Sequence, residues 1–319
     1  MEELPKSQAY NVIPKPLRKV RLRDLNPESS QTAILSTRRL SVLLLPRLIM
    51  PYLTIPHGRI FYTDFPSHDS PPRATLILHH GLGSTHAFYR SITPALTSPP
   101  YNFRCTTYDT ISSGLSDLAS EPQSIQGLAQ DAIEVLNALG VKEKAIFVGH
   151  SMGGVVASEI AATKGDRIKG SVMLGPPLPS PTVRKTFEGR VKAVEEGGME
   201  AMADIIPTGA TGSKSTPLQH AFIRTLLLSQ RPEGYCSMCK ALGGASPPDY
   251  AAIKMPTLMV AGEEDKSAPL AGCEEIFERT GGEKSMEVVQ AMGHWFCIED
   301  PESIVKLIGA FVEKVTQPN

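Results

Sequence analysis

The 319-residue sequence is poor in aromatic residues and carries almost no net charge. Phe, Trp and Tyr together make up 6% of it, with a single Trp, and the formal net charge is -1. Binding to nucleic acid or to an anionic membrane surface needs a basic surface, so this composition argues against both partners. We therefore expect a small-molecule substrate and no nucleic-acid partner, while the oligomeric state stays open.

The sequence has no apolar run long enough to span a bilayer, which takes about 20 residues. Its most apolar segment, "LSVLLLPRLIMPYL", is interrupted by Pro46 and Arg47. We interpret residues 1–49 as an N-terminal extension, poorly ordered or docked, and expect the compact domain to begin near Met50. A secretory signal would place its apolar core nearer Met1. We expect a cytoplasmic protein, with mitochondrial or peroxisomal location as alternatives to it, and no secretion.

The five cysteines are odd in number and irregularly spaced, which argues against a disulfide framework. Cys236 and Cys239 form a CxxC motif, but no second pair and no CxxH follows to complete a zinc site. We interpret this pair as two residues one turn apart on a helix. We predict neither a metal nor another cofactor.

Short apolar segments alternate with helical patterns along most of the chain. We predict seven strands, at residues 58–65, 74–81, 103–110, 145–150, 170–175, 257–262 and 286–290. The clearest helical pattern is 124–140, which ends at Gly140. This alternation predicts an α/β fold with a mostly parallel central sheet flanked by helices. Sites in such sheets form at the carboxyl ends of the strands.

Residues 176–253 break the alternation, because they contain no clear strand and several short helical patterns. We interpret this segment as a helical cap inserted between two sheet strands, above their ends. The sheet core would then comprise residues 50–175 and 254–319.

The sequence "GHSMG" fits the pattern G-x-S-x-G, follows an apolar run and opens a helical pattern. A strand that turns sharply into a helix exposes a serine at the apex, and side chains at Gly149 and Gly153 would clash in so tight a turn. The free N–H groups of the helix N-terminus favour negative charge beside the serine. We predict Ser151 as a nucleophile and the Met152 N–H as one oxyanion donor.

A serine nucleophile needs a base, and in this architecture the chain order is serine, acid, histidine. Only two histidines follow Ser151 in the sequence. His220 lies inside the predicted cap, whereas His294 follows the last predicted strand, in a loop that faces the same rim as Ser151. We predict His294 as the base.

The acid should follow a strand between the serine and the histidine. Glu263, Glu264 and Asp265 come directly after the strand 257–262, whereas the preceding strand ends with no carboxylate. We predict Asp265 as the residue that orients the base. We interpret the two glutamates as solvated turn residues.

The loop after the strand 74–81 should supply the second oxyanion donor. In "HHGLGST", Gly81 and Gly83 let the backbone approach the site, and Leu82 is placed to donate its N–H. We expect His79 and His80, which precede this turn, to have structural roles.

With these segments the chain resembles the α/β-hydrolase superfamily, through "HHGLGS", "YDTISSGLS", "VGHSMGG", "GEEDKSAP" and "GHWFCIEDPE" in order over residues 58–313. It is most similar to 3-oxoadipate enol-lactonases, through "YDT", "VGHSMGGVVASEIA", "PEGYCSMCKAL" and "GEEDKSAP". The resemblance implies hydrolysis of a lactone or carboxylic ester through an acyl-enzyme on Ser151, without a cofactor. Ile111, Ser112 and Ser113 stand where that group tends to have Arg-Gly-His.

A substrate with carboxylates would need cations under the cap, and arginine binds carboxylates with two hydrogen bonds. The segment offers Arg184, Lys185, Arg190, Arg224 and Arg231. We name Arg231 and Trp295 as candidate substrate contacts, although Trp295 would also serve to pack its loop. The alternatives are C–C bond hydrolysis or acyl transfer by the same triad, and a ligand-binding protein with little turnover. A haloalkane dehalogenase is disfavoured because it would need a carboxylate at position 151.

Overall fold

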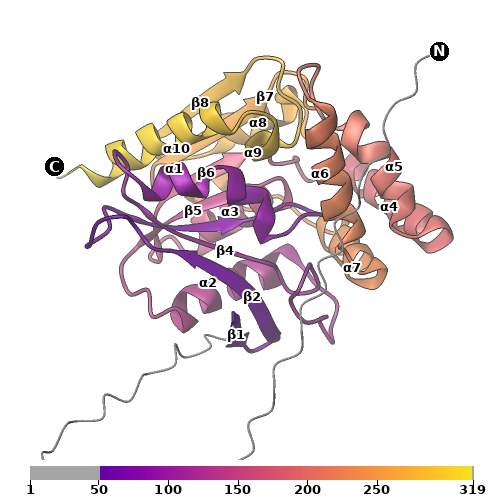
Figure 1. Cartoon of the computed structure of the whole chain (residues 1–319), viewed down its shortest axis with the longest axis horizontal. Coiled ribbons are helices and arrows are strands. Elements are labelled where there is room, and N and C mark those ends of the chain that lie inside the picture. Colours follow the sequence, from indigo (N-terminus) through magenta and orange to yellow (C-terminus); the bar gives the residue numbers. More distant parts are fainter. Residues whose placement is uncertain (1–50, 318–319) are drawn as a thin grey trace, which may run out of the picture. The chain divides into compact units, whose positions relative to one another are not determined.

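The computed structural model describes residues 51–317, which contain an eight-stranded sheet of order β1-β2-β4-β3-β5-β6-β7-β8 (Figure 1). The strands are β1 (Tyr52–Ile55), β2 (Gly58–Phe65), β3 (Thr75–His79), β4 (Arg104–Tyr108), β5 (Ala145–His150), β6 (Ile168–Leu174), β7 (Thr257–Gly262) and β8 (Lys284–Val289). The pairs β1–β2 and β2–β4 are antiparallel, and the other five pairs are parallel. The predicted α/β fold with a mostly parallel sheet is confirmed. The predicted extension, residues 1–49, lies outside the described residues.

All seven predicted strands are present, and β2, β5 and β7 have the predicted bounds. The prediction missed β1, which precedes the first strand that the sequence indicates. This strand has only four residues and pairs with β2 in the register Tyr52↔Phe61. A segment this short has little periodicity of its own, so its strand conformation depends on the pairing with β2.

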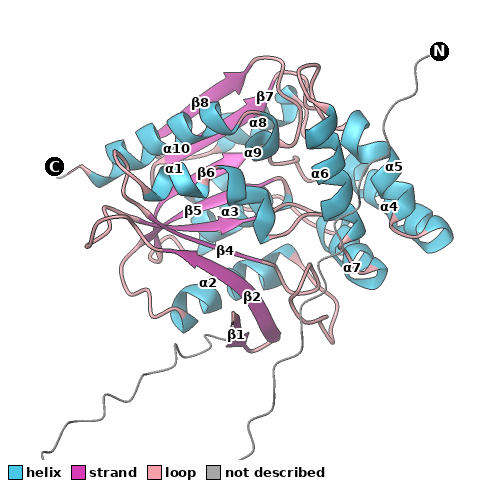
Figure 2. Cartoon of the chain, viewed as in Figure 1, coloured by secondary structure: helices cyan, strands magenta, loops and turns pink. Residues whose placement is uncertain are grey.

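Helices cover both faces of the sheet (Figure 2). They are α1 (Thr93–Thr97), α2 (Ile125–Ala138), α3 (Met152–Thr163), α8 (Leu270–Arg279), α9 (Phe296–Glu299) and α10 (Pro301–Thr316), with the 3₁₀ helices η1 (His86–Ser91) and η2 (Tyr250–Ala252). Helix α3 contacts β5, β6 and α2, whereas α10 contacts β6, α1 and α9. Every residue of β3, β5 and β7 is buried, as expected for parallel strands covered on both faces.

Four α-helices lie between β6 and β7 in the chain, before η2: α4 (Pro181–Gly197), α5 (Glu200–Gly209), α6 (Pro217–Leu228) and α7 (Pro232–Gly243). Helix α4 packs against α7, and α5 packs against α6 and α4. Figure 1 shows them gathered on the side toward which the arrows of β7 and β8 point. The all-helical character of this segment is confirmed, and Cys236 and Cys239 both lie buried on α7. The limits of the cap at residues 176 and 253 stay a prediction.

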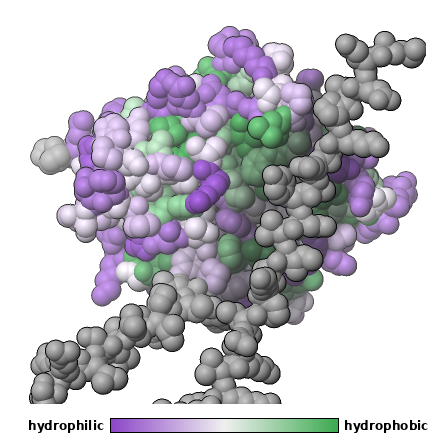
Figure 3. Space-filling model, in the orientation of Figure 1, coloured by the Kyte–Doolittle hydropathy of each residue, from purple (hydrophilic) through white to green (hydrophobic). Residues whose placement is uncertain are grey.

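The cap carries several exposed apolar side chains, namely Ile205, Leu218, Phe222 and Leu228. On the face drawn in Figure 3, apolar side chains are visible beside the cap helices among mostly polar ones. Within residues 51–317, no helix is both long enough and apolar enough to cross a membrane.

Candidate active site

Ser151 stands between β5 and α3 in a strained backbone conformation, with φ 54° and ψ -116°. A residue other than glycine rarely adopts a positive φ, and holding it there costs about 1–3 kcal/mol. The surrounding structure maintains the conformation: the Ser151 N–H donates to the Leu174 carbonyl at 2.8 Å, and its own carbonyl accepts from Gly154 and Val155. The serine therefore sits at the apex of a rigid turn from a strand into a helix.

Glycines are required around this turn because backbones approach each other closely. A Cβ at Gly149 would lie 1.9 Å from the Gly153 carbonyl oxygen, and a Cβ at Gly153 would lie 2.2 Å from the His79 carbonyl oxygen. A Cβ at Gly81 would lie 2.8 Å from that of Ser151. No side chain fits at these distances, in agreement with the clash expected from the sequence.

The three residues predicted as a triad lie in one chain of hydrogen bonds. The His294 Nε2 is 2.8 Å from the Ser151 Oγ, and the His294 Nδ1 is 2.7 Å from the Asp265 Oδ2. The other carboxylate oxygen of Asp265 accepts from the N–H groups of Ser267 and Ala268, at 2.8 and 2.9 Å. The exposed fractions of Ser151, His294 and Asp265 are 7%, 8% and 5%. An imidazole so placed can take the hydroxyl proton while the carboxylate fixes its tautomer.

The two glutamates beside Asp265 bond elsewhere. Glu264 accepts from the N–H and the hydroxyl of Ser213 in the cap, at 2.6 and 2.7 Å. The hydrogen bond from the Ser213 hydroxyl is the main reason that the pKa of Glu264 lies below its usual value. Glu263 accepts from the Ala291 N–H at 2.8 Å. Both lie in the turn after β7, Glu263 exposed and Glu264 half-buried, as interpreted from the sequence, and each also accepts hydrogen bonds from a neighbouring segment.

The two predicted oxyanion donors border the serine from different elements. Met152 is the first residue of α3, so its N–H has no acceptor within the helix. Leu82 lies in the turn after β3 and lines the same cavity as Ser151. In the described part of the chain, neither N–H donates to another backbone group. The turn is tight at Gly83, which has φ +73° and where a Cβ would lie 2.7 Å from the Leu227 side chain.

His79 and His80 are buried supports of this turn, as predicted. The His80 Nδ1 is 2.8 Å from the Gly81 carbonyl, and its Nε2 accepts from the Thr110 N–H at 3.1 Å. Because Nε2 accepts, Nδ1 carries the proton and the ring is neutral. Burial lowers the pKa of His80, and it lowers the pKa of His79 to about 3. Neither ring is placed to serve as a base.

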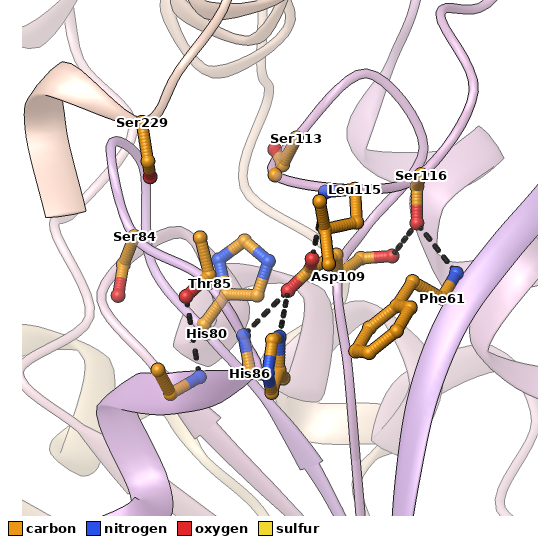
Figure 4. A network of polar contacts seen from close by, with 12 residues as sticks. Phe61, His80, Ser84, Thr85, His86, Asp109, Ser113, Leu115, Ser116 and Ser229 are labelled. Atoms are coloured by element: carbon orange, nitrogen blue, oxygen red, sulfur yellow. Dashed lines mark hydrogen bonds and ion pairs between the residues drawn. The ribbon is translucent and has the colours of Figure 1, made fainter. Parts of the chain in front are cut away.

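A polar network centred on Asp109, at the end of β4, holds the same turn from the other side (Figure 4). Its carboxylate accepts from the His86 N–H at 2.6 Å, the His86 Nδ1 at 2.7 Å and the Leu115 N–H at 2.9 Å. Burial alone would raise the pKa of Asp109, but the hydrogen bond from His86 and the nearby histidines lower it. The ionised carboxylate thus joins the residues after Leu82 to the β4 loop.

His150 is a site residue that the sequence analysis missed. Its ring stacks on Phe88 with centroids 4.3 Å apart, and its Nε2 is 2.7 Å from the carbonyl oxygen of His294. Burial lowers the pKa of His150 well below its ordinary value, so the neutral ring donates through Nε2. The residue before Ser151 therefore holds the backbone of His294. A histidine inside G-x-S-x-G gives no sign of this contact, because the partner is distant in sequence.

A cavity of about 460 Å³ opens onto Ser151 and His294, between the cap and the strand ends. Its walls include Phe187 and Ile206 from the cap, and Ile205, which is 60% exposed, stands at its opening. Trp295, one of the two candidate substrate contacts, lines the cavity as well. A pocket with mostly apolar walls and a few polar groups suits a small organic ligand.

Two cations line the cavity, Arg190 on α4 and Lys266 in the loop after β7. The Arg190 guanidinium lies 5.0 Å from the Phe187 ring centroid, and within residues 51–317 it pairs with no carboxylate. Arg231 is not among the lining residues, and its guanidinium donates to the Ser116 carbonyl. The described residues contain no group of three or more His, Cys, Asp or Glu side chains that could hold a metal ion.

Comparisons with known proteins agree with this architecture. Residues 74–301 match the family model described as alpha/beta hydrolase fold. The enol-lactonase from Burkholderia xenovorans LB400 is similar with a TM-score of 0.75 and 25% identity, over 82% of this chain and 100% of that one. A thermophilic esterase from Thermogutta terrifontis shares the fold, with a TM-score of 0.74, 22% identity and 83% and 98% coverage. A relative from Caulobacter sp. (strain K31), "Putative carbamate hydrolase RutD", is 25% identical over 239 residues, 72% of this chain and 87% of its own.

Proposed function

The chain belongs to the α/β-hydrolase fold family, and on this premise we propose that it is a hydrolase that cleaves a carboxylic ester or lactone through an acyl-enzyme on Ser151. The observation that carries the proposal is the chain of contacts from the Ser151 hydroxyl to His294 at 2.8 Å and on to Asp265 at 2.7 Å. Ser151 and His294 line a cavity with room for a small ester. In these proposed roles Ser151 is the nucleophile, His294 the base and Asp265 the acid.

In the acylation step the Ser151 Oγ attacks the carbonyl carbon of the substrate, and its proton moves to the His294 Nε2. Asp265 accepts the Nδ1–H, which keeps the imidazole in the useful tautomer and stabilises the imidazolium. The negative charge that develops on the carbonyl oxygen is stabilised by the N–H groups of Leu82 and Met152. One such donor contributes about 3 kcal/mol of transition-state stabilisation.

The imidazolium then gives its proton to the leaving alkoxide oxygen, so the C–O bond breaks and an ester to Ser151 remains. In a lactone the leaving oxygen stays attached to the acyl group. His294 next takes a proton from water as the water oxygen attacks the acyl carbon. Return of the proton to Ser151 releases the carboxylic acid.

For the substrate we propose a small ester or lactone that carries a carboxylate. The apolar walls suit its carbon skeleton, and the Arg190 guanidinium, which pairs with no carboxylate among residues 51–317, suits its charge. The similarity to the Burkholderia enol-lactonase supports a lactone. We assign the anion contact to Arg190 rather than to Arg231, because Arg190 faces the cavity. Trp295 would contact the carbon skeleton.

Other uses of the same site differ in the bond broken or in the acceptor. A carbamate has nitrogen beside the carbonyl, and the RutD relative carries that substrate class in its name. Hydrolysis of a C–C bond and transfer of the acyl group to an acceptor other than water use the same triad. A protein that binds its ligand and turns over little is the contrasting class.

The test is the hydrolysis rate on a panel, with Ser151→Ala as the blank. The panel holds 3-oxoadipate enol-lactone, neutral lactones of similar size, short and medium acyl esters with and without a carboxylate, and an aryl carbamate. Turnover of esters or lactones that the blank lacks supports the proposal. Turnover of the carbamate alone would mean that the substrate is a carbamate and not an ester or lactone. Equal rates in the blank and the native chain would reject the mechanism.

A further inference from the structure

Glu299, the last residue of α9, accepts four hydrogen bonds that join the cap to the loop carrying the base. Two come from the cap: its Oε2 accepts from the Gly212 N–H at 2.7 Å and the Ser215 hydroxyl at 3.0 Å. Two come from the neighbours of His294, since Gly293 N–H donates to Oε2 at 3.0 Å and Trp295 N–H donates to Oε1 at 2.7 Å. One carboxylate therefore binds a cap segment and both sides of the base.

The base differs from the other two triad residues in what holds its backbone. The His294 N–H donates to the carbonyl of Ala210, the residue that follows α5 in the cap, at 2.8 Å. In contrast, the Ser151 N–H donates to the end of β6, and the Asp265 N–H donates to the end of β7. Of the three triad residues, only His294 thus has its backbone N–H bound by the cap.

The contact between the two segments is close along the backbone. A Cβ at Gly212 would lie 2.2 Å from the Ala291 carbonyl oxygen, and a Cβ at Gly293 would lie 2.3 Å from the Gly212 nitrogen. Glycine at both positions lets the chains touch, and hydrogen bonds to a charged carboxylate are stronger than those to a neutral group. These close approaches and the four hydrogen bonds to Glu299 therefore give the two segments one well-defined relative position.

We propose that Glu299 is a positioning residue through which the cap sets the location of the catalytic histidine. This inference rests on the proposed role of His294 as base. The cap then does more than enclose the substrate, because its docked position completes the geometry of proton transfer. If the four hydrogen bonds weaken, the loop at 291–296 moves relative to Ser151, and a misplacement of about 1 Å costs roughly 10²-fold in rate.

The test is Glu299→Gln, which keeps the side-chain size but removes the charge and turns an amide NH₂ toward backbone donors. The matched control is Glu302→Gln, the same change at an exposed residue that pairs with Lys306 at 2.8 Å. Three readouts are compared: kcat and KM on the best ester of the panel, the rate of Ser151 labelling by a fluorophosphonate, and hydrogen–deuterium exchange at 209–216 and 291–296.

For Glu299→Gln we expect kcat and the labelling rate to fall roughly 10- to 100-fold while KM changes by less than about threefold. Exchange should rise in the two joined segments and stay unchanged in β5 and β6. The control should match the native chain in all readouts. If Glu299→Gln does not fold, Ser215→Ala removes one cap-side bond, and a fall of about threefold in kcat with the same local exchange supports the proposal.

Native values of kcat and labelling in Glu299→Gln, or in Ser215→Ala if that variant replaces it, would overturn the proposal. So would a general rise of exchange across β5 and β6, because that result assigns Glu299 a structural role only. Failure of the underlying function is distinguishable, since the native chain would then show no turnover beyond that of Ser151→Ala. An inactive Ser151→Ala together with an unaltered Glu299→Gln rejects the inference about the cap alone.

Discussion

The nucleophile and the base are held by different parts of the molecule. Ser151 is held by β5, β6 and α3. It lies in a turn where the backbone leaves no space for a side chain at position 149 or 153. His294 is fixed by the cap residue Ala210, by His150 and, through its neighbours, by Glu299. The nucleophile is therefore part of the sheet core, whereas the base depends on contacts between segments that are distant in sequence.

Because of this difference, substitutions in the cap and substitutions in the nucleophile turn should impair activity in different ways. A change that loosens the cap should displace the base and spare the nucleophile turn. A change inside the turn should damage the core itself. Variants on each side test this separation, and their expected effects decrease from the nucleophile to the cap arginines.

Replacing the nucleophile should have the largest effect. Ser151→Ala should lower kcat by as much as about 10⁶-fold, because no other group can form the acyl-enzyme. The variant should fold normally, since alanine needs no more space than serine at this position. Initial rates and thermal unfolding measure both effects. Turnover that survives in a pure sample would contradict the triad.

Replacing the acid should come next. Asp265→Asn should lower kcat by roughly 10⁴-fold, because the amide favours the wrong tautomer of His294. The matched control is Glu264→Gln, one residue away, whose carboxylate binds Ser213 in the cap instead. We expect the control to lose much less kcat than Asp265→Asn, because it weakens a contact to the cap loop but leaves His294 bound to its carboxylate. A larger loss in Glu264→Gln than in Asp265→Asn would mean that the acid is misassigned.

Two glycine variants compare the two regions directly. In Gly153→Ala the new Cβ meets the His79 carbonyl at 2.2 Å, and in Gly212→Ala it meets the Ala291 carbonyl at the same distance. Overpacking of this kind costs about 1–3 kcal/mol or more. We expect Gly153→Ala to lower the unfolding temperature, whereas Gly212→Ala should lower kcat roughly tenfold or more, with a smaller change in unfolding temperature. The reverse pattern would contradict the separation of the two regions.

The cap arginines should give the smallest effect. Arg190→Gln should raise KM roughly tenfold for an ester that carries a carboxylate, and change it little for a neutral ester of the same size. Arg231→Gln is the control, because Arg231 donates to Ser116 and does not line the cavity. If the two variants change KM equally for both esters, Arg190 does not contact the substrate carboxylate.

The sequence predicted the parts of the structure that depend on local pattern. Strands such as β5 and β7 are continuous apolar runs, and the turn at Ser151 needs glycines at fixed spacing. The order of serine, acid and histidine then selected Asp265 and His294 from few candidates. These features can be predicted because each depends on residues adjacent in sequence or on their order along the chain.

The residues that the prediction missed depend on contacts between distant segments. Which cap arginine faces the cavity follows from the packing of α4 on α7, and the pattern of charges does not encode it. Glu264 and Glu299 accept hydrogen bonds from the cap loop at residues 210–216. The sequence does not indicate these bonds, because the loop is distant from both glutamates in the chain. His150 acts through a carbonyl 144 residues away in sequence.

The most direct test of the central claim is covalent labelling by a fluorophosphonate, followed by mass spectrometry of the peptide that contains residue 151. The proposed mechanism predicts one adduct per chain, on Ser151, and a labelling rate reduced at least about 10²-fold in His294→Gln. The absence of an adduct in the native chain would contradict the mechanism. So would an adduct on Ser151 that forms at the native rate when His294 is replaced.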